Sequence, residues 1–172
     1  MGFLGSTCSD AVGSFGGLFL GWSSRVVVSI IFVDENVIFC KITSELNLDY
    51  YIVFVYGCPY LNGRAQVWSN IKTLMAGNPG STTIVGNLNQ VEHTAQKLGG
   101  SPLLRGAQDF INWKLECDLS EIPARGMSYT WTNNRSGESA IFESLDRAYA
   151  CSKWRITFPD AIIWKLPIFL SD

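Results

Sequence analysis

The segment between residues 50 and 85 constrains the fold most, because it has the pattern of a strand, a helix and a second strand in direct succession. Residues 50–56 are apolar or aromatic throughout, which is typical of a strand buried on both faces. Between residues 64 and 76 the apolar side chains recur at helical spacing, namely Val67, Trp68, Ile71, Leu74 and Met75. Gly77-Asn78-Pro79-Gly80 ends this pattern, and the β-branched run at residues 82–85 follows. A βαβ unit of about 35 residues predicts two parallel strands in one sheet.

The rest of the chain predicts strands before this unit and a mixture of helix and strand after it. The expected strands cover residues 16–22, 25–33, 37–42, 127–133 and 161–166. A loop over residues 92–106 is expected to lead into a second helix, whose apolar face carries Ala107, Phe110, Ile111 and Leu115. Leu145-Asp146-Arg147 is expected to begin a short helix. This order of elements predicts an α/β protein.

The composition fits one globular domain spanning residues 1–172. Hydrophobic residues make up 47% of the chain and charged residues only 16%, which excludes a disordered protein and leaves part of the surface apolar. The net charge of -2 supplies no general attraction to phosphate backbones. Nucleic-acid binding would therefore depend on a local basic surface.

Cysteine spacing and the N-terminal sequence indicate the compartment. The five cysteines form no C-x-x-C pair, so neither a zinc site nor a disulfide framework is expected: Cys8, Cys40, Cys58, Cys117 and Cys151. Arg25 divides the apolar stretch over residues 11–33 into pieces too short to span a bilayer, and no positive charge opens a secretory leader. We therefore expect an intracellular protein, cytoplasmic or nuclear, without membrane association.

A polar turn at residues 86–90 is the main candidate for a functional site. Gly86-Asn87-Leu88-Asn89 directly follows the second strand of the βαβ unit. Because alternate residues of a strand share a face, Asn87 and Asn89 are expected to project on the same side at the edge of the sheet. The alternative interpretation is a strand that ends in an asparagine-rich turn.

Six short motifs follow one another in an order that suggests a known family. They are Val55-Tyr56-Gly57-Cys58-Pro59, Gly86-Asn87-Leu88-Asn89-Gln90, Gln96-Lys97-Leu98-Gly99-Gly100, Tyr129-Thr130-Trp131-Thr132-Asn133, Ser144-Leu145-Asp146-Arg147 and Ser171-Asp172. With them the chain resembles the endonuclease/exonuclease/phosphatase family, which has the DNase I-like fold. It is most similar to the endonuclease domain of plant LINE-type non-LTR retrotransposons. Each motif is short, and their joint order carries the resemblance.

The resemblance implies an α/β (α+β) fold, a DNase I-like β-sandwich of mixed sheets flanked by helices, here incomplete. It also implies a Mg²⁺-dependent hydrolase acting on phosphodiester bonds, with DNA as the partner. By matched motif, Asn87 stands where the family has the water-orienting Asp, and Asn89 where it has a phosphate-contacting Asn. Tyr56 matches a tyrosine near the phosphate, and Asp146 the Asp that positions a catalytic His. Asp172 matches the acid beside that His and is the expected metal ligand.

Three departures from the family pattern predict a degenerate, inactive enzyme. Asn87 replaces a carboxylate, and an amide cannot accept a proton from water. No His follows Asp172, and His93, the only histidine, lies in a loop where we expect it to face solvent. The family's metal-binding segment, with an Asn and a later Glu on separate strands, would precede Gly16, where the sequence does not supply it.

Two other functions remain open, as do structural roles for the individual residues. The chain could be an active Mg²⁺-dependent nuclease or phosphoesterase, or a non-enzymatic module that binds nucleic acid or protein. Tyr56 could simply end a buried strand, Asp146 could be a helix charge, and Asn89 could close its own turn. An incomplete sandwich also predicts self-association through exposed sheet edges.

Overall fold

The chain folds around one mixed sheet of six strands in the order β3-β4-β5-β6-β12-β8. The computed structural model describes residues 2–13 and 15–166, so Asp172 lies outside the described residues. The strands are β3 (Val26–Val33), β4 (Val37–Ser44), β5 (Asp49–Tyr56), β6 (Thr82–Asn87), β8 (Leu119–Glu121) and β12 (Asp146–Cys151). Strands β5 and β6 run parallel, and the other neighbours are antiparallel. The predicted βαβ unit is thereby confirmed.

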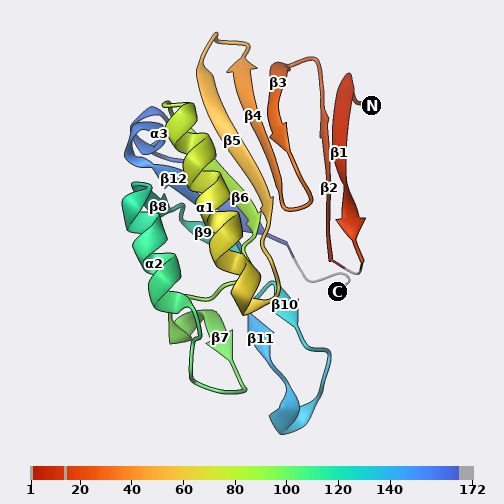
Figure 1. Ribbon diagram of the computed structural model, residues 1–172, viewed down its shortest axis with the longest axis vertical. Coiled ribbons are helices and arrows are strands. Elements are labelled where there is room, and N and C mark those ends of the chain that lie inside the picture. The colour runs from red at the N-terminus through yellow and green to blue at the C-terminus, as the bar shows by residue number, and fades with distance from the viewer. Residues whose placement is uncertain (1, 14, 167–172) are drawn as a thin grey trace.

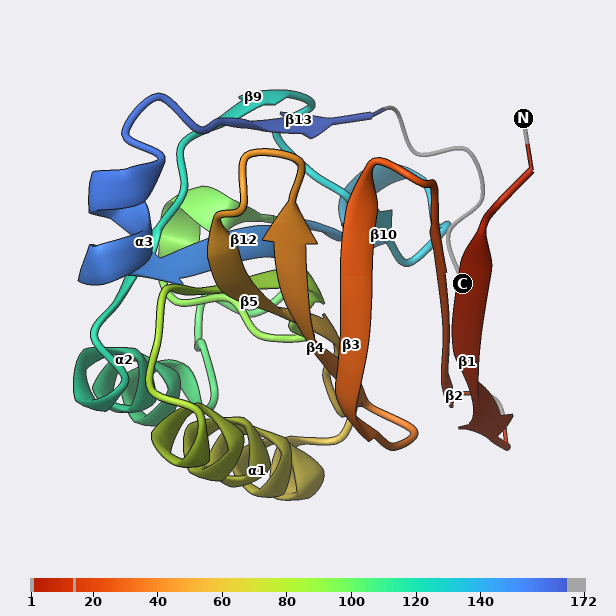
Figure 2. The same cartoon turned by 90° about the horizontal axis from the view of Figure 1, so that it is seen from above.

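Two helices cover one face of this sheet, as Figures 1 and 2 show. They are α1 (Leu61–Gly77), which connects β5 to β6, and α2 (Ala107–Glu116). The buried cluster beneath them contains Val53, Val55, Ile71, Ile84, Phe110 and Tyr149. The indole Nε1 of Trp113 on α2 donates a hydrogen bond of 2.8 Å to the Trp68 carbonyl on α1. Aromatic packing and this bond hold the two helices together against the sheet.

The second layer is built from both ends of the described chain. The hairpin of β1 (Gly5–Val12) and β2 (Phe15–Trp22) packs against β4 and β5. Farther along, α3 (Ser152–Thr157) and the parallel pair of β9 (Ala124–Gly126) and β13 (Ile163–Lys165) lie near β12. A second buried cluster fills this side, formed by Ile122, Ala148, Ala150, Cys151 and Trp154. The expected sandwich of sheets flanked by helices is confirmed.

A small three-stranded sheet extends from one end of the main sheet, at the bottom of Figure 1. It comprises β7 (Lys97–Leu98), β10 (Trp131–Thr132) and β11 (Phe142–Glu143), in the order β10-β11-β7. Two 3₁₀ turns accompany it, Thr94–Gln96 and Gly137–Ser139. The strand expected over residues 127–133 is thus only two residues long. The strand is short because it pairs with β11 over just two residues.

The expected helix at Leu145-Asp146-Arg147 is wrong, because Asp146–Cys151 is strand β12 and the helix begins only at Ser152. Residues 147 to 151 are all buried, and a short run buried on both faces has no periodicity that separates strand from helix. Strands β1, β8 and β9 were not expected either. Among the described residues, no helix is long and apolar enough to cross a bilayer.

Candidate functional site

Three of the predicted site residues lie side by side at one end of the main sheet. In the parallel pair β5–β6, Tyr56 is the register partner of Asn87. In the antiparallel pair β6–β12, Asp146 is the register partner of the same Asn87. Tyr56 and Asn87 are half-buried, whereas Asp146 is exposed. Strand pairing therefore gathers an aromatic ring, an amide and a carboxylate from segments up to 90 residues apart.

The two glycines beside this site allow backbones to approach closely. Gly86 has a φ of 142°, and a Cβ atom there would lie 2.0 Å from the Val55 carbonyl oxygen. At Gly57 a Cβ atom would lie 2.5 Å from the Leu88 carbonyl oxygen. The Gly57 N–H donates a 2.7 Å hydrogen bond to the Asn87 carbonyl. Glycine is thus required at residue 57, directly after β5, and at residue 86 in β6.

The Asn87 side chain closes the turn that follows β6. Its Oδ1 accepts a hydrogen bond of 2.8 Å from the Asn89 backbone N–H, which is an Asx turn. Asn89 has a φ of 48°, and its Nδ2 donates a 2.6 Å bond to the Gly57 carbonyl. Strand alternation therefore does not place Asn89, because β6 ends at Asn87. The expectation that both amides project from one strand face is wrong for this reason.

The site is also fixed from the two flanking loops. The Thr130 Oγ1 accepts hydrogen bonds of 3.0 Å from the backbone N–H groups of Leu145 and Asp146. On the other side, Asn36 Nδ2 donates to the Tyr56 carbonyl and the Tyr56 N–H donates to the Asn36 carbonyl, both at 2.8 Å. Asn36 is therefore a polar neighbour of the site, and none of the six motifs includes it.

A buried ionic cluster lies next to the site. Arg147, the residue after Asp146, has a fully buried side chain whose Nη1 donates a 2.6 Å bond to Glu92 Oε1. Tyr149 donates its hydroxyl hydrogen to Glu92 Oε1, and Lys114 pairs with Glu92 Oε2. Burial alone would raise the Glu92 pKa, but the bonds from Lys114 and Tyr149 and the charge of Arg147 outweigh it and lower the pKa. Glu92 therefore stays ionised in the interior.

Arg64 joins the two loops that leave β5 and β6. Its Nη1 donates a 2.7 Å bond to Gln90 Oε1, and its Nη2 and Nε donate to the carbonyls of Pro59 and Cys58 at 2.9 and 3.2 Å. Gln90 is almost fully buried and donates through Nε2 to the Arg105 carbonyl at 3.1 Å. The guanidinium thus ties the loop after Tyr56 to the turn after Asn87.

Solved structures with the same arrangement of strands and helices reveal the fold. The endonuclease domain of TRAS1, a telomere-specific non-LTR retrotransposon, matches with a TM-score of 0.67 at 14% identity, over 86% of this chain and 66% of that domain. The chain has the DNase I-like fold. A 3′ phosphatase from Neisseria, solved with a product DNA hairpin, matches with a TM-score of 0.55 at 13% identity, over 87% of this chain and 68% of that one.

Other comparisons limit how far the similarity extends. Beta toxin from Staphylococcus aureus matches the DNase I-like chain with a TM-score of 0.55 at 13% identity, over 78% of this chain and 50% of the toxin. The chain thus spans about two thirds of the TRAS1 domain and half of the toxin. Neither a protein-family model nor a curated protein sequence matches it.

Clustered metal ligands are scarce at this end of the DNase I-like fold. Within residues 2–13 and 15–166, no three His, Cys, Asp or Glu side chains lie close enough to hold a metal ion. Tyr56, Asn87 and Asp146, which are register partners on β5, β6 and β12, form a register triplet. This triplet offers one carboxylate, from Asp146, beside the amide of Asn87 and the ring of Tyr56. His93 is exposed, as expected, at the start of a 3₁₀ turn. Asp172, the expected metal ligand, falls outside the described residues.

Proposed function

We propose that this DNase I-like chain is a degenerate remnant of a metal-dependent phosphodiesterase of the retrotransposon endonuclease type, and that it is catalytically inactive. Asn87 is the residue that carries the proposal. It occupies the centre of the register triplet, between Tyr56 and Asp146, where water activation would require a group that can accept a proton. A neutral amide oxygen cannot do this at ordinary pH.

The local hydrogen bonds support a structural role for Asn87 in its place. Its Oδ1 already accepts from the Asn89 N–H, and the Asn89 amide donates to the Gly57 carbonyl. Both asparagines therefore hold the turn through one atom of each amide. Losing a general base typically lowers a rate by roughly 10²- to 10⁴-fold, before any loss of metal ligands is counted.

Metal-assisted chemistry would also need oxygen ligands for the ion. Mg²⁺ is usually held through one or two carboxylates together with substrate phosphates. Asp146 is the only carboxylate in the register triplet, and its backbone N–H is bound by Thr130 Oγ1. We therefore expect any remaining contact with DNA to be weak and non-catalytic. We also propose that copies of the chain associate through an exposed sheet edge.

A plasmid-nicking assay tests the proposal. Supercoiled DNA is incubated with the wild-type chain and with Asn87→Asp, each with Mg²⁺ and with a chelator. We expect neither protein to nick the plasmid, because restoring the carboxylate leaves the donor set for the metal incomplete. Nicking by the wild-type chain that the chelator abolishes would overturn the proposal and establish an active nuclease. Nicking by Asn87→Asp alone would show that the other catalytic parts are present.

The same samples measure DNA contact. Fluorescence anisotropy with a labelled duplex, read at low and high salt, reports binding independently of cleavage. A weak signal that disappears at high salt is the expected result for a chain with a net charge of -2. Tight binding that survives high salt would favour a dedicated nucleic-acid module instead.

A further inference from the structure

Strand β13 carries apolar side chains on its outer face, where a surface strand usually carries polar ones. Ile163 packs against the second buried cluster, and Lys165 Nζ donates a 2.5 Å hydrogen bond to Ser144 Oγ, so these two residues define the inner face. The residues that alternate with them are 47%, 63% and 71% exposed, in the order Ile162, Trp164 and Leu166. The outer face of β13 is therefore apolar and open to solvent.

A guanidinium group lies beside the exposed indole. Arg125 on β9 is the parallel register partner of Trp164. Register partners on neighbouring strands lie about 4.8 Å apart and project on the same face of the sheet. Arg125 is exposed, and within the described residues it forms no ion pair. Its charge is thus available to a ligand bound over the Trp164 ring. We call Ile162, Trp164, Leu166 and Arg125 the outer strip.

The segments that form this surface are basic, although the whole chain is acidic. Residues 122–132 and 152–166 contain four basic residues and one acidic residue, which is a net charge of +3. The whole chain has a net charge of -2, so the remaining residues together carry -5. An acidic chain needs such a local basic surface in order to bind nucleic acid.

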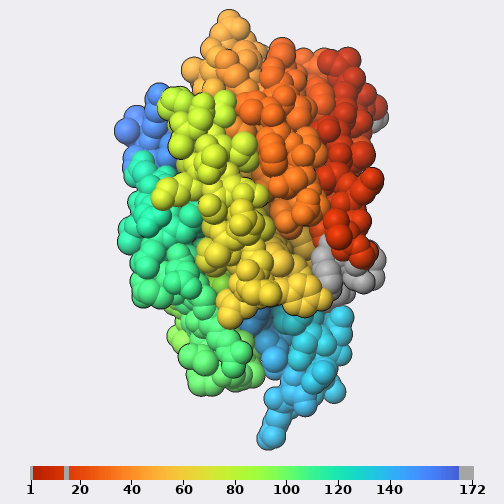
Figure 3. All heavy atoms as spheres, in the orientation of Figure 1, coloured from red at the N-terminus to blue at the C-terminus, as the bar shows by residue number. Residues whose placement is uncertain are grey.

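The outer strip is accessible and lies near the register triplet. Figure 2 shows β9 and β13 along the outside of the molecule, with no helix or strand over them. Helices α1 and α2 lie on the opposite face, which is the one seen in Figure 3. The bond from Lys165 reaches Ser144, two residues before Asp146, so β13 passes close to the start of β12. The strip therefore adjoins the triplet but forms a separate surface.

We propose that the outer strip binds single-stranded nucleic acid, with an unpaired base stacked on the Trp164 indole and a neighbouring phosphate bound by the Arg125 guanidinium. Every base has a flat π-face, so stacking on an exposed ring tolerates any sequence. Bases inside a duplex stack on one another and leave no such face for the indole. An acidic peptide would use the charge of Arg125 but would not need an aromatic plane beside it. The surface thus favours an unpaired nucleic-acid strand.

Fluorescence anisotropy of the full 172-residue chain with a labelled oligothymidylate of about twelve nucleotides tests the proposal. We expect saturable binding of the single strand, and binding at least about fivefold weaker when the same strand is annealed to its complement. Trp164→Ala should weaken single-strand binding by roughly fivefold to a hundredfold, the range for losing one stacked base. Equal affinity for the two forms of DNA, or an unchanged affinity in Trp164→Ala, would refute the proposal.

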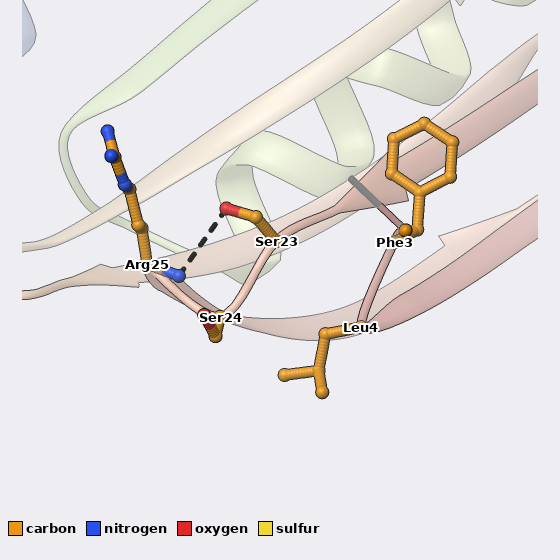
Figure 4. Close-up of a pocket in the computed structure, with 6 residues that line it drawn as sticks. Phe3, Leu4, Ser23, Ser24 and Arg25 are labelled. Atoms are coloured by element: carbon orange, nitrogen blue, oxygen red, sulfur yellow. Dashed lines mark hydrogen bonds between the residues drawn. The ribbon is translucent and has the colours of Figure 1, made fainter.

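Phe3 and Arg25 provide the matched controls. Phe3 is 66% exposed, and Arg25 is exposed and forms no ion pair within the described part of the chain. Figure 4 shows the Arg25 side chain pointing away from Phe3 in the open pocket that both residues line. Phe3→Ala and Arg25→Met should therefore bind the oligonucleotide like the wild type. A loss in Phe3→Ala as large as that in Trp164→Ala would overturn the assignment to the outer strip.

Arg125→Met tests the phosphate contact. Loss of one phosphate contact to a single strand reduces the slope of log K against log salt concentration by about 0.7. We expect this reduction in Arg125→Met and an unchanged slope in Trp164→Ala. A wild-type slope in Arg125→Met would exclude the phosphate contact. Thermal melts check that each variant remains folded.

A competing peptide separates the two classes of ligand. A soluble peptide of alternating Glu and Leu is added to the complex of the chain with labelled oligothymidylate. We expect it to displace the label far less effectively than unlabelled oligothymidylate does. Displacement at an equal or lower concentration would overturn the proposal and indicate a protein-binding surface. These measurements need neither metal nor cleavage, so they test the outer strip independently of the nicking assay.

Discussion

Asn87 lies opposite Asp146 in the antiparallel register of β6 and β12, so an amide and a carboxylate share one end of the sheet. Directly opposed residues on antiparallel strands project on the same face. A carboxylate at position 87 would therefore face a second carboxylate, that of Asp146. The amide relieves that repulsion and still supplies the oxygen that closes the Asx turn.

Asn87→Asp should consequently lower the free energy of unfolding at neutral pH by about 0.2–1 kcal/mol. Acid should remove the difference, because protonation of either carboxylate ends the repulsion. Asn87→Ala should lose about 0.5–1.5 kcal/mol at every pH, since the hydrogen bond to the Asn89 N–H disappears. Urea denaturation at two pH values measures both. A cost for Asn87→Asp that persists in acid would contradict this account.

Gly86→Ala should destabilise the chain by at least about 2 kcal/mol, because the residue combines a φ of 142° with a carbonyl 2.0 Å from the position of a Cβ. Gly77→Ala at the end of α1 is the control, since a Cβ there meets nothing within 4 Å. It should be neutral or slightly stabilising. Comparable unfolding midpoints for the two variants would show that β5 and β6 do not require the close approach.

Arg147→Met should cost about 3–5 kcal/mol, because it leaves Glu92 buried without its Nη1 donor. Lys72→Met removes a different ion pair, with Glu116, in which both side chains are more than half exposed. That variant should change stability by less than about 1 kcal/mol. Chemical denaturation measures the free energy of unfolding of both variants. Equal losses would mean that the buried ionic cluster stabilises the fold no more than a surface ion pair does.

Stability should also fall in acid through Glu92. Its pKa is lower in the folded chain than the ordinary value of 4.5, so the ionised group stabilises the fold above that pH. The contribution disappears as the pH falls from about 4.5 through the folded-state pKa. Glu92→Gln should flatten this part of the stability profile. Asp49→Asn is the control. Lys41 lowers the pKa of Asp49 as well, but this carboxylate is exposed and solvent screens the pair, so its removal should leave the stability profile nearly unchanged.

The long periodic segments could be predicted from sequence, whereas the short ones could not. The α1 pattern and the apolar run of β5 extend over enough residues to show their period. Strands β8 and β9 have three residues each and exist because β12 and β13 lie beside them. Strand β12 is buried on both faces, which removes the alternation that would have distinguished it from a helix.

The site was predictable only in part for a similar reason. Motif order indicated that Tyr56, Asn87 and Asp146 belong together, and the strand register brings them together. The charged residues of the buried ionic cluster carried no comparable signal in the sequence. Glu92 and Lys114 look like ordinary surface residues in the sequence, and their burial depends on how α2 packs against β12. Such pairs become visible only in three dimensions.

The distance in sequence between β6 and β12 affects how the chain is made. About 60 residues separate Asn87 from Asp146, and a ribosome adds roughly 5–20 residues each second. For several seconds of synthesis, β6 therefore has β5 on one side and nothing on the other. During that interval its open side can pair with any extended segment nearby. Correct assembly of the sheet then depends on how well the nascent chain is shielded before β12 emerges.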